Sequence, residues 1–273
     1  MTATTLTPIG TPDVDVRGLR RFPVAVNDTL ALAWRNLMGY VRIPQLLVFS
    51  TIQPVMLVLL FTYVFGGAID TGSVPYVDYL MPGIFAQTVT FGAMSTAVGL
   101  STDLGLGLIE RFRSLPMARS AVLAGRTTAD LVRNFLVVIL MVIVGFAVGY
   151  RVHTNVFAFI GAMLIVLLFG FALSWIFATV GLLVKDPETA QAASFPVLAP
   201  LIFASSAFVP VDSMPDWLQP FATYQPLSCV VTAVRGITLG TPDSFDIFLA
   251  LAWCIGILAV AAPLAVRRYR MAA

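Results

Sequence analysis

The amino-acid sequence predicts an all-α polytopic membrane protein with six transmembrane helices. Of its 273 residues, 59% are hydrophobic and only 11% are charged, whereas a soluble domain carries about 25% charged residues. Six segments are apolar over roughly the 20 residues that a helix needs to cross the hydrocarbon core of a bilayer. Most basic residues fall in the connections on one side of such an arrangement, which indicates its orientation.

Two segments are expected before the first span. Residues 1–26 are polar and rich in Thr, Pro and Asp, and we predict a disordered cytoplasmic tail. Residues 27–43 are predicted to form an amphipathic helix in the membrane interface, because apolar side chains recur on one face at helical spacing. That face consists of Leu30, Trp34, Leu37, Met38 and Val41. An ordinary cytoplasmic helix is the alternative.

The remaining residues, 44–273, are predicted to form one six-helix transmembrane domain. The spans cover approximately residues 45–65, 79–101, 128–148, 156–184, 189–209 and 245–266. Proline predicts a kink at Pro54 in the first span and interruptions at Pro196 and Pro200 in the fifth. The fourth span is long enough to tilt in the bilayer or to project from it.

Charge places both termini in the cytoplasm. In that orientation the inner side holds 14 of the 16 basic residues, and only Arg151 and Arg235 lie outside. Residues 227–239 are helical in pattern but too short to cross, and they connect two spans whose ends lie outside. We therefore expect a re-entrant or surface helical hairpin on the outer side, between spans five and six. Trp217 and Tyr224 suit the headgroup level there.

Few side chains are placed for catalysis or metal binding. The chain has one histidine, His153, and its two cysteines, Cys229 and Cys254, are expected to be buried apolar residues. These residues have no metal-site spacing, so no metal is predicted. Asp130 and Arg133 lie three residues apart near the inner end of the third span, where they can pair on one helix face or reach the interface.

A nucleotide-binding loop is also absent from the sequence. The phosphate-binding motif ends in Gly-Lys followed by Ser or Thr, but the only lysine is Lys185, between Val184 and Asp186. If ATP drives this protein, another chain must bind the ATP.

The largest charged connection between spans runs from Asp103 to Pro116. Its apolar residues recur every three or four positions, and charged residues flank them: Leu104, Leu108, Phe112 and Leu115, beside Glu110, Arg111 and Arg113. A short helix of this pattern could dock into a groove of a soluble partner, with apolar anchors for affinity and charges for orientation. A loop lying on the lipid surface explains the pattern equally well.

Several stretches resemble the ATP-binding-cassette type-2 permeases, and most of all the daunorubicin-resistance permeases among them. These are Met81–Gly83, Glu110–Pro116, Arg126, Pro210–Phe221, Gln225–Ser228 and Ala233–Gly236. The resemblance extends over roughly residues 27–270. No single stretch is as specific as a phosphate-binding loop, but their order and spacing match the predicted topology.

The resemblance implies two paired six-helix subunits, each docking a cytoplasmic ATPase subunit that binds ATP and Mg²⁺. This chain would then be a transport permease, would bind no cofactor itself and would not be an enzyme. The coupling helix that contacts the ATPase would consist of Leu108, Ile109, Glu110, Arg111, Phe112, Arg113 and Ser114. A second cytoplasmic contact would involve Lys185, Asp186 and Glu188, and an outer gate would involve Trp217, Tyr224 and Arg235.

The same resemblance places the translocation path along spans two and five, at the interface of the paired subunits. The candidate lining residues are Gln87, Thr88, Phe91, Ser95, Phe195, Phe203 and Ser206. Simple helix packing also explains small and hydroxyl residues in spans. The mixture of aromatic and weakly polar side chains suits a hydrophobic or amphipathic cargo.

The predicted function is the permease subunit of an ATP-driven exporter of drugs, antibiotics or lipids in the plasma membrane. Its partners would be the ATPase, a second permease subunit, membrane lipid and cargo, but no nucleic acid. Alternatives are a polysaccharide or glycolipid exporter of the same family, an ion-driven carrier, a membrane-embedded enzyme and a scaffold. The carrier would need a carboxylate buried within a span and the enzyme a polar catalytic cluster, and the sequence identifies neither.

Overall fold

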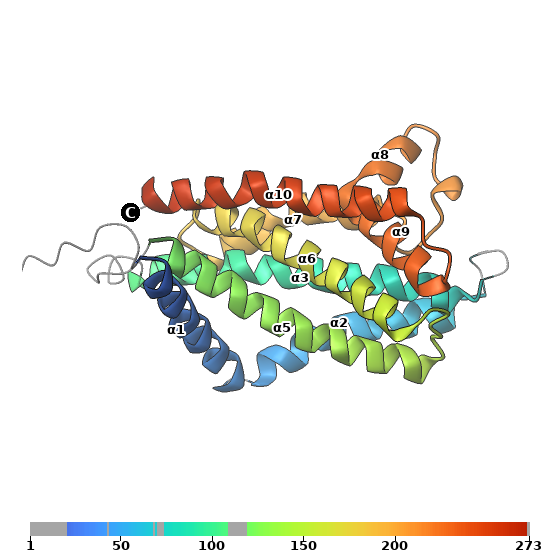
Figure 1. Cartoon of the computed structure of the whole chain (residues 1–273), viewed down its shortest axis with the longest axis horizontal. Coiled ribbons are helices and arrows are strands. Elements are labelled where there is room, and N and C mark those ends of the chain that lie inside the picture. The colour runs from blue at the N-terminus through green and yellow to red at the C-terminus, as the bar shows by residue number, and fades with distance from the viewer. Residues whose placement is uncertain (1–20, 43, 68, 70–73, 109–118, 272–273) are drawn as a thin grey trace, which may run out of the picture.

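The computed structural model describes residues 21–42, 44–67, 69, 74–108 and 119–271, and every regular element in these ranges is helical. The longer helices lie side by side along one axis (Figure 1). In chain order the helices are α1 (Arg21–Arg42), α2 (Pro44–Leu60), α3 (Tyr76–Gly105), α5 (Arg119–Val148), α6 (Val156–Gly181), α7 (Pro187–Phe203), α8 (Gln219–Tyr224), α9 (Pro226–Leu239) and α10 (Ser244–Met271). A π-helical turn, Phe61–Phe65, follows α2, and a 3₁₀ turn, Val211–Ser213, precedes α8.

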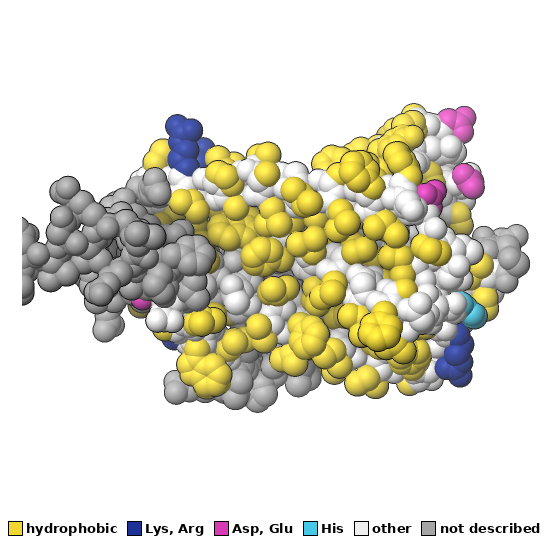
Figure 2. Space-filling view, viewed as in Figure 1, with side chains coloured by type: hydrophobic (Ala, Val, Ile, Leu, Met, Phe, Trp, Pro, Cys, Tyr) yellow, Lys and Arg dark blue, Asp and Glu magenta, His cyan; other side chains and the backbone are white. Residues whose placement is uncertain are grey.

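Four helices of the described part are long and apolar enough to cross a membrane. They are Tyr76–Gly105, Ala121–Val148, Val156–Gly181 and Ser244–Tyr269, which correspond to predicted spans two, three, four and six. Hydrophobic side chains cover the middle of the visible face, and charged side chains gather toward the two ends of the bundle (Figure 2). The all-helical membrane class is confirmed. The helices α2 and α7 have 17 residues each, so the count of six spans stays a prediction.

Two helix ends differ from the predicted bounds. The helix α1 begins at Arg21 rather than at residue 27, and Pro23 falls in its first turn, where proline is tolerated. The helix α7 ends at Phe203 rather than near residue 209. Beyond it the Ser205 hydroxyl donates to the Ile202 carbonyl (2.7 Å), and the Ser206 amide donates to the Ser228 hydroxyl (3.0 Å). Such side-chain bonds compete with helical backbone bonds.

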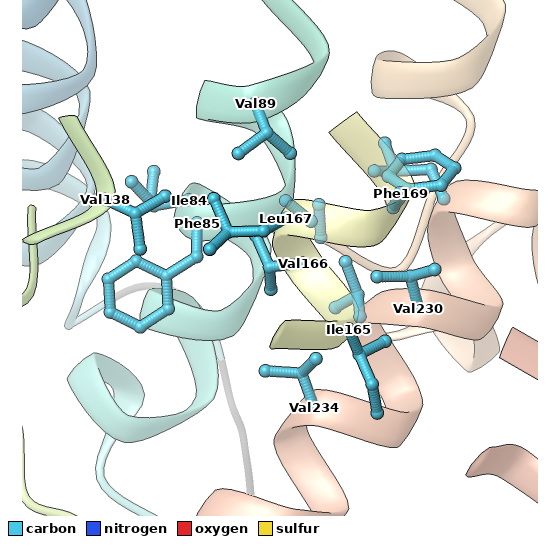
Figure 3. Close-up of a cluster of buried hydrophobic side chains, with 14 of the residues drawn as sticks. Ile84, Phe85, Val89, Val138, Ile165, Val166, Leu167, Phe169, Val230 and Val234 are labelled. Carbon is cyan, nitrogen blue, oxygen red and sulfur yellow. The ribbon is translucent and has the colours of Figure 1, made fainter. Parts of the chain in front are cut away.

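The helix α3 lies at the centre of the bundle. Its buried Ile84, Phe85 and Val89 meet apolar side chains of three other helices (Figure 3): Val138 of α5, Ile165, Val166, Leu167 and Phe169 of α6, and Val230 and Val234 of α9. Glycine permits close backbone approach, since a Cβ at Gly181 would lie 2.5 Å from the Ala97 carbonyl oxygen. This packing holds α3 and α6 against each other.

The helix α1 packs on α5, and its exposed Trp34 faces away from that contact. Leu32 and Ala33 are buried, and a Cβ at Gly125 of α5 would lie 2.7 Å from the Leu32 Cβ. Leu30 and Trp34, which belong to the predicted apolar face, are 57% and 63% exposed. An apolar face turned away from the protein suits burial among lipids.

Candidate translocation cavity and coupling region

A cavity of about 180 Å³ lies between α2, α3 and α5. Four predicted path residues line it, namely Gln87, Thr88, Phe91 and Ser95. Its other lining residues are Gln53, Pro54, Leu57, Gly92, Met94, Arg133, Asn134 and Val137. The wall therefore combines amide, hydroxyl and guanidinium groups with aromatic, aliphatic and thioether groups.

The predicted path residues of the fifth span lie elsewhere. Phe195 and Phe203 of α7 are 56% and 74% exposed, and neither lines this cavity. Ser206 is buried, and its backbone amide donates to the Ser228 hydroxyl at 3.0 Å. The structure thus brings together the candidates of α3 but not those of the fifth span.

The carboxylate of Asp130 is completely buried beside the cavity, between α3 and α5. The Thr96 hydroxyl donates to its Oδ2 at 2.6 Å. Arg126 Nε lies 3.5 Å from Oδ2, and Arg133 Nη1 lies 3.8 Å from Oδ1. Arg133 also donates to the Gly92 carbonyl and, at 3.3 Å, to Asn134 Oδ1. The predicted pair of Asp130 and Arg133 is present, inside a larger buried network.

This network continues toward the end of the bundle at which α1 begins. The Asp103 carboxylate of α3 lies 3.8 Å from Arg35 Nη2 of α1 and also interacts electrostatically with Arg126. The Arg126 guanidinium lies over Gly99 and donates to the Ser95 carbonyl at 3.2 Å. Five charges of alternating sign therefore connect α1 with the cavity, and we call them the charge ladder: Arg35, Asp103, Arg126, Asp130 and Arg133.

The sequence could suggest only part of the ladder. The spacings of Arg126, Asp130 and Arg133, four and three residues apart, place them on one helix face. The contacts with Thr96, Gly92 and Arg35 join different helices and depend on how those helices pack.

The predicted second cytoplasmic contact lies against the C-terminal end of α3. A Cβ at Gly105 would lie 2.8 Å from the Lys185 carbonyl oxygen. The side chains of Lys185, Asp186 and Glu188 are exposed. Asp186 caps α7, because its Oδ2 accepts hydrogen bonds from the Thr189 amide and hydroxyl, both at 2.8 Å. These bonds lower the pKa of Asp186 below its ordinary value.

The predicted coupling helix falls mostly outside the described residues. Ile109, Glu110, Arg111, Phe112, Arg113 and Ser114 lie there, so their role stays a prediction. Leu108, the last residue described before that gap, is half-buried. Among the described residues, the Lys185 turn packs on α3 three residues before Leu108.

At the opposite end of the bundle, Arg235 of α9 joins two other segments. Its Nε donates to the Tyr79 carbonyl at 3.0 Å, and its Nη2 donates to the Ser206 carbonyl at 2.8 Å. The guanidinium carbon lies 3.6 Å from the centre of the Tyr79 ring, a cation–π contact. We call Arg235, Tyr79 and Ser206 the outer clamp.

The three predicted gate residues occupy different environments. Arg235 is only 9% exposed, whereas Trp217 and Tyr224 are 78% and 62% exposed. The Tyr224 carbonyl accepts a hydrogen bond from Trp253 Nε1 of α10 at 3.1 Å. Arg235 thus stabilises the interior of this end of the bundle, while Trp217 and Tyr224 lie on its surface.

Comparison with known proteins decides the family. Residues 27–239, well over half of the chain, match the ABC-2 type transporter family. The chain belongs to the ABC-2 type transporter family. It is 37% identical to the daunorubicin resistance ABC transporter permease protein DrrB1 of Streptomyces coeruleorubidus, over 90% of this chain and 87% of that protein.

Two further relatives are less similar in sequence. The chain is 29% identical to the probable doxorubicin resistance ABC transporter permease protein DrrC of Mycobacterium tuberculosis, over 68% of each chain. It is 26% identical to the putative transport permease ycf38 of Porphyra purpurea, over 84% of this chain and 80% of that protein. As an ABC-2 permease subunit, the chain is an integral membrane protein that works with an ATP-binding subunit and is not itself an enzyme.

Proposed function

We propose that this permease exports hydrophobic or amphipathic compounds, such as drugs, antibiotics or lipids, out of the cell. The observation that carries the proposal is the partly polar cavity beside α3, which the charge ladder joins to the inner end of the bundle. Relatives named for daunorubicin and doxorubicin resistance support a cargo of this class. A polysaccharide chain would suit a wider, more polar passage than this cavity offers.

The proposed topology has six spans with both termini in the cytoplasm. The helices α2 and α7 would be the first and fifth spans, and α8 with α9 would form the outer hairpin. The beginning of α1, the end of α3, the beginning of α5 and the end of α10 gather at one end of the bundle, opposite α8 and α9 (Figure 1). That grouping and the distribution of basic residues both support this arrangement.

Energy would enter at the cytoplasmic end. Residues 108–114 would form the coupling helix, and the turn Lys185, Asp186 and Glu188 would be a second contact with the ATPase, which alone would bind ATP and Mg²⁺. ATP binding would favour one arrangement of the spans over another, because ligands act through their different affinities for two states. No covalent chemistry would occur in the permease.

Two permease subunits would pair, either two copies or this chain and a sister permease. The exposed Phe195 and Phe203 of α7 support a role at that interface, since neither is covered within one subunit. Cargo would pass between the subunits, and the outer hairpin with Trp217, Tyr224 and Arg235 would gate its exit.

The coupling assignment can be tested with the double variant Arg111→Ala/Phe112→Ala, co-expressed with the partner ATPase. We expect loss of ATPase co-purification and of ATP-driven export, because the apolar anchor and its flanking charge are both removed. Arg267→Ala is the matched control, since Arg267 is a basic residue at the inner end of α10 and outside the loop. Undiminished assembly and export in the double variant would refute the coupling-helix assignment.

A further inference from the structure

A groove of about 370 Å³ lies between α6 and α10, separate from the candidate translocation cavity. The residues that line it include Ile176, Thr179 and Val180 of α6 and Trp253, Val260 and Leu264 of α10. Val260 is 70% exposed and Leu264 is 42% exposed. Both helices are long and apolar enough to cross a membrane, so the groove opens toward lipid.

The side chains that line this groove in the described part of the chain offer a ligand no free hydrogen-bond donor. Only two of them carry a donor, Thr179 and Trp253. The Thr179 hydroxyl donates to the Trp175 carbonyl, and Trp253 Nε1 donates to the Tyr224 carbonyl, both at 3.1 Å. Sites for drug-sized molecules usually contain a few polar groups that orient the ligand. The groove is therefore suited to a plain hydrocarbon chain.

The length of the groove matches one leaflet of a bilayer. Its lining residues on α10 extend from Trp253 to Leu264, over which a helix rises by about 16 Å. This is about half of a hydrocarbon core that is about 30 Å thick. Gly256 keeps the middle of the groove open, since it is exposed and a Cβ there would meet nothing within 4 Å.

A basic side chain, Arg268, lies just beyond one end of the groove. Arg268 follows the lining residues Leu264 and Ala261 by four and seven positions, so it lies on the same face of α10. Side chains of a helix lean toward its N-terminus, which for Arg268 is the direction of the groove. Arg268 is exposed and forms no ion pair with another described residue. Basic side chains project over the C-terminal end of α10 in Figure 2.

We propose that this groove binds one acyl chain of an anionic phospholipid, and that Arg268 binds the phosphate of the same molecule. A guanidinium matches the geometry of a phosphate. A zwitterionic headgroup would bring its own cation close to Arg268, so the anionic lipid is preferred. The bound chain would contact both α6 and α10 and stabilise the folded bundle, since it binds only the folded state. The proposal does not depend on which compounds the permease exports.

The fluorescence of Trp253 can report on occupancy, because bromine atoms on an acyl chain quench a tryptophan that they contact. The other three of the four tryptophans, Trp34, Trp175 and Trp217, are changed to Phe in the full-length permease. The protein is reconstituted into phosphatidylcholine bilayers, and phosphatidylglycerol with brominated chains is compared with phosphatidylcholine that carries the same chains. We expect half-maximal quenching at about fivefold lower content of the anionic lipid, the effect of one basic residue near a lipid surface. Equal quenching by the two lipids, or quenching by neither, would overturn the proposal.

Substitutions at Arg268 test the contact with the headgroup. Arg268→Gln should reduce the preference for the anionic lipid to less than about twofold, because the charge that one basic residue supplies is removed. Arg268→Lys keeps the charge and should retain the preference. A full preference in Arg268→Gln would refute the assignment of the phosphate to this residue. Should the protein with a single tryptophan not fold, native mass spectrometry of the unaltered permease with the two lipids makes the same comparison.

A substitution at Gly256 separates a site from simple attraction between anionic lipid and a basic helix end. Gly256→Leu fills the groove with a side chain that meets no other part of the protein at its Cβ, so the preference should be lost although Arg268 is intact. Gly161→Leu is the matched control, because Gly161 of α6 is equally open but does not line the groove. A preference that persists in Gly256→Leu would show that charge alone attracts the lipid, and would overturn the proposed site.

Discussion

The two ends of the bundle bury arginine in different ways. In the outer clamp, Arg235 bonds to the carbonyls of Tyr79 and Ser206 and lies over an aromatic ring. In the charge ladder, Arg126 and Arg133 share the carboxylate of Asp130. The positions of backbone carbonyls are fixed by the path of the chain, so the stability of the clamp depends on the geometry of the donor that reaches them. Carboxylates neutralise the arginine charges, so the stability of the ladder depends on whether each carboxylate keeps its charge.

The largest expected effect comes from removing charge at the ladder. Asp130→Asn keeps the size of the side chain but leaves Arg126 and Arg133 buried without their carboxylate. Breaking a buried ion pair by removing one partner typically costs about 3–5 kcal/mol. Thermal unfolding of the purified protein in detergent measures this loss.

Asp103→Asn is the matched control for that change. The side chain of Asp103 is 15% exposed, whereas that of Asp130 is completely buried, so water can partly replace the lost carboxylate. We expect less than half the destabilisation. Equal losses at both positions would contradict the view that burial makes the ladder sensitive to charge.

A charge-preserving substitution should instead break the outer clamp. Arg235→Lys keeps a cation but cannot place two donors on the Tyr79 and Ser206 carbonyls at once. We expect a loss of about 1.5–3 kcal/mol, the range for hydrogen bonds of charged groups. Amide hydrogen exchange of residues 204–240 should become faster.

The comparison variant is Arg133→Lys, which keeps the charge of the ladder and should cost less than Arg235→Lys. If Arg133→Lys were the more damaging of the two, the distinction between a clamp set by geometry and a ladder set by charge would be wrong.

The helices α3 and α6 pack closely, and substitutions of two glycines in α6 test how much this contact contributes to stability. Gly181→Ala places a Cβ against the Ala97 backbone, whereas a Cβ at Gly161 meets nothing within 4 Å. We expect Gly181→Ala to destabilise by about 1–3 kcal/mol through overpacking, and Gly161→Ala to stabilise by up to about 1 kcal/mol through helix propensity. Unfolding temperatures that moved together would show that α6 does not pack on α3 as described.

The smallest effect concerns Asp186, in the exposed turn before α7. Its pKa is lowered by the hydrogen bonds from Thr189, so its capping contribution is present above the unfolded pKa of about 4 and is lost as pH falls through the lower folded pKa. Asn is also a good cap but does not titrate there. The difference in stability between wild type and Asp186→Asn should shrink as pH is lowered from 6 to 3. A constant difference would exclude the titration of this carboxylate.

Hydrophobic length was sufficient to predict the class and most of the long helices. The central span was expected at residues 79–101 and is Tyr76–Gly105. A long apolar run can be recognised in the sequence whatever the helix packs against. The end of α7 could not be predicted in this way, because it depends on the bond between Ser206 and Ser228, which are 22 residues apart.

For the candidate site too, features within one helix were predicted and contacts between helices were not. Gln87, Thr88, Phe91 and Ser95 were predicted from one helix, and all four line the cavity. Asn134 also lines the cavity and was missed, because its position there depends on which face of α5 turns toward Gly92 of α3. Asp130 was expected close to the cytoplasmic boundary, and only the packing of Thr96, Arg126 and Arg133 around it reveals its complete burial. Spacing along the sequence predicts which residues share one face of a helix, whereas the contacts between helices are known only from the folded structure.

The central claim is that ATP hydrolysed by a partner drives export through this chain. The most direct measurement is uptake of doxorubicin into inside-out vesicles that contain the permease with or without its ATPase subunit. We predict uptake that requires ATP and the ATPase, that is abolished by Arg111→Ala/Phe112→Ala and that persists when an uncoupler dissipates the proton gradient. Uptake without the ATPase that collapses with the uncoupler would contradict the account and would assign Asp130 to an ion-driven carrier instead.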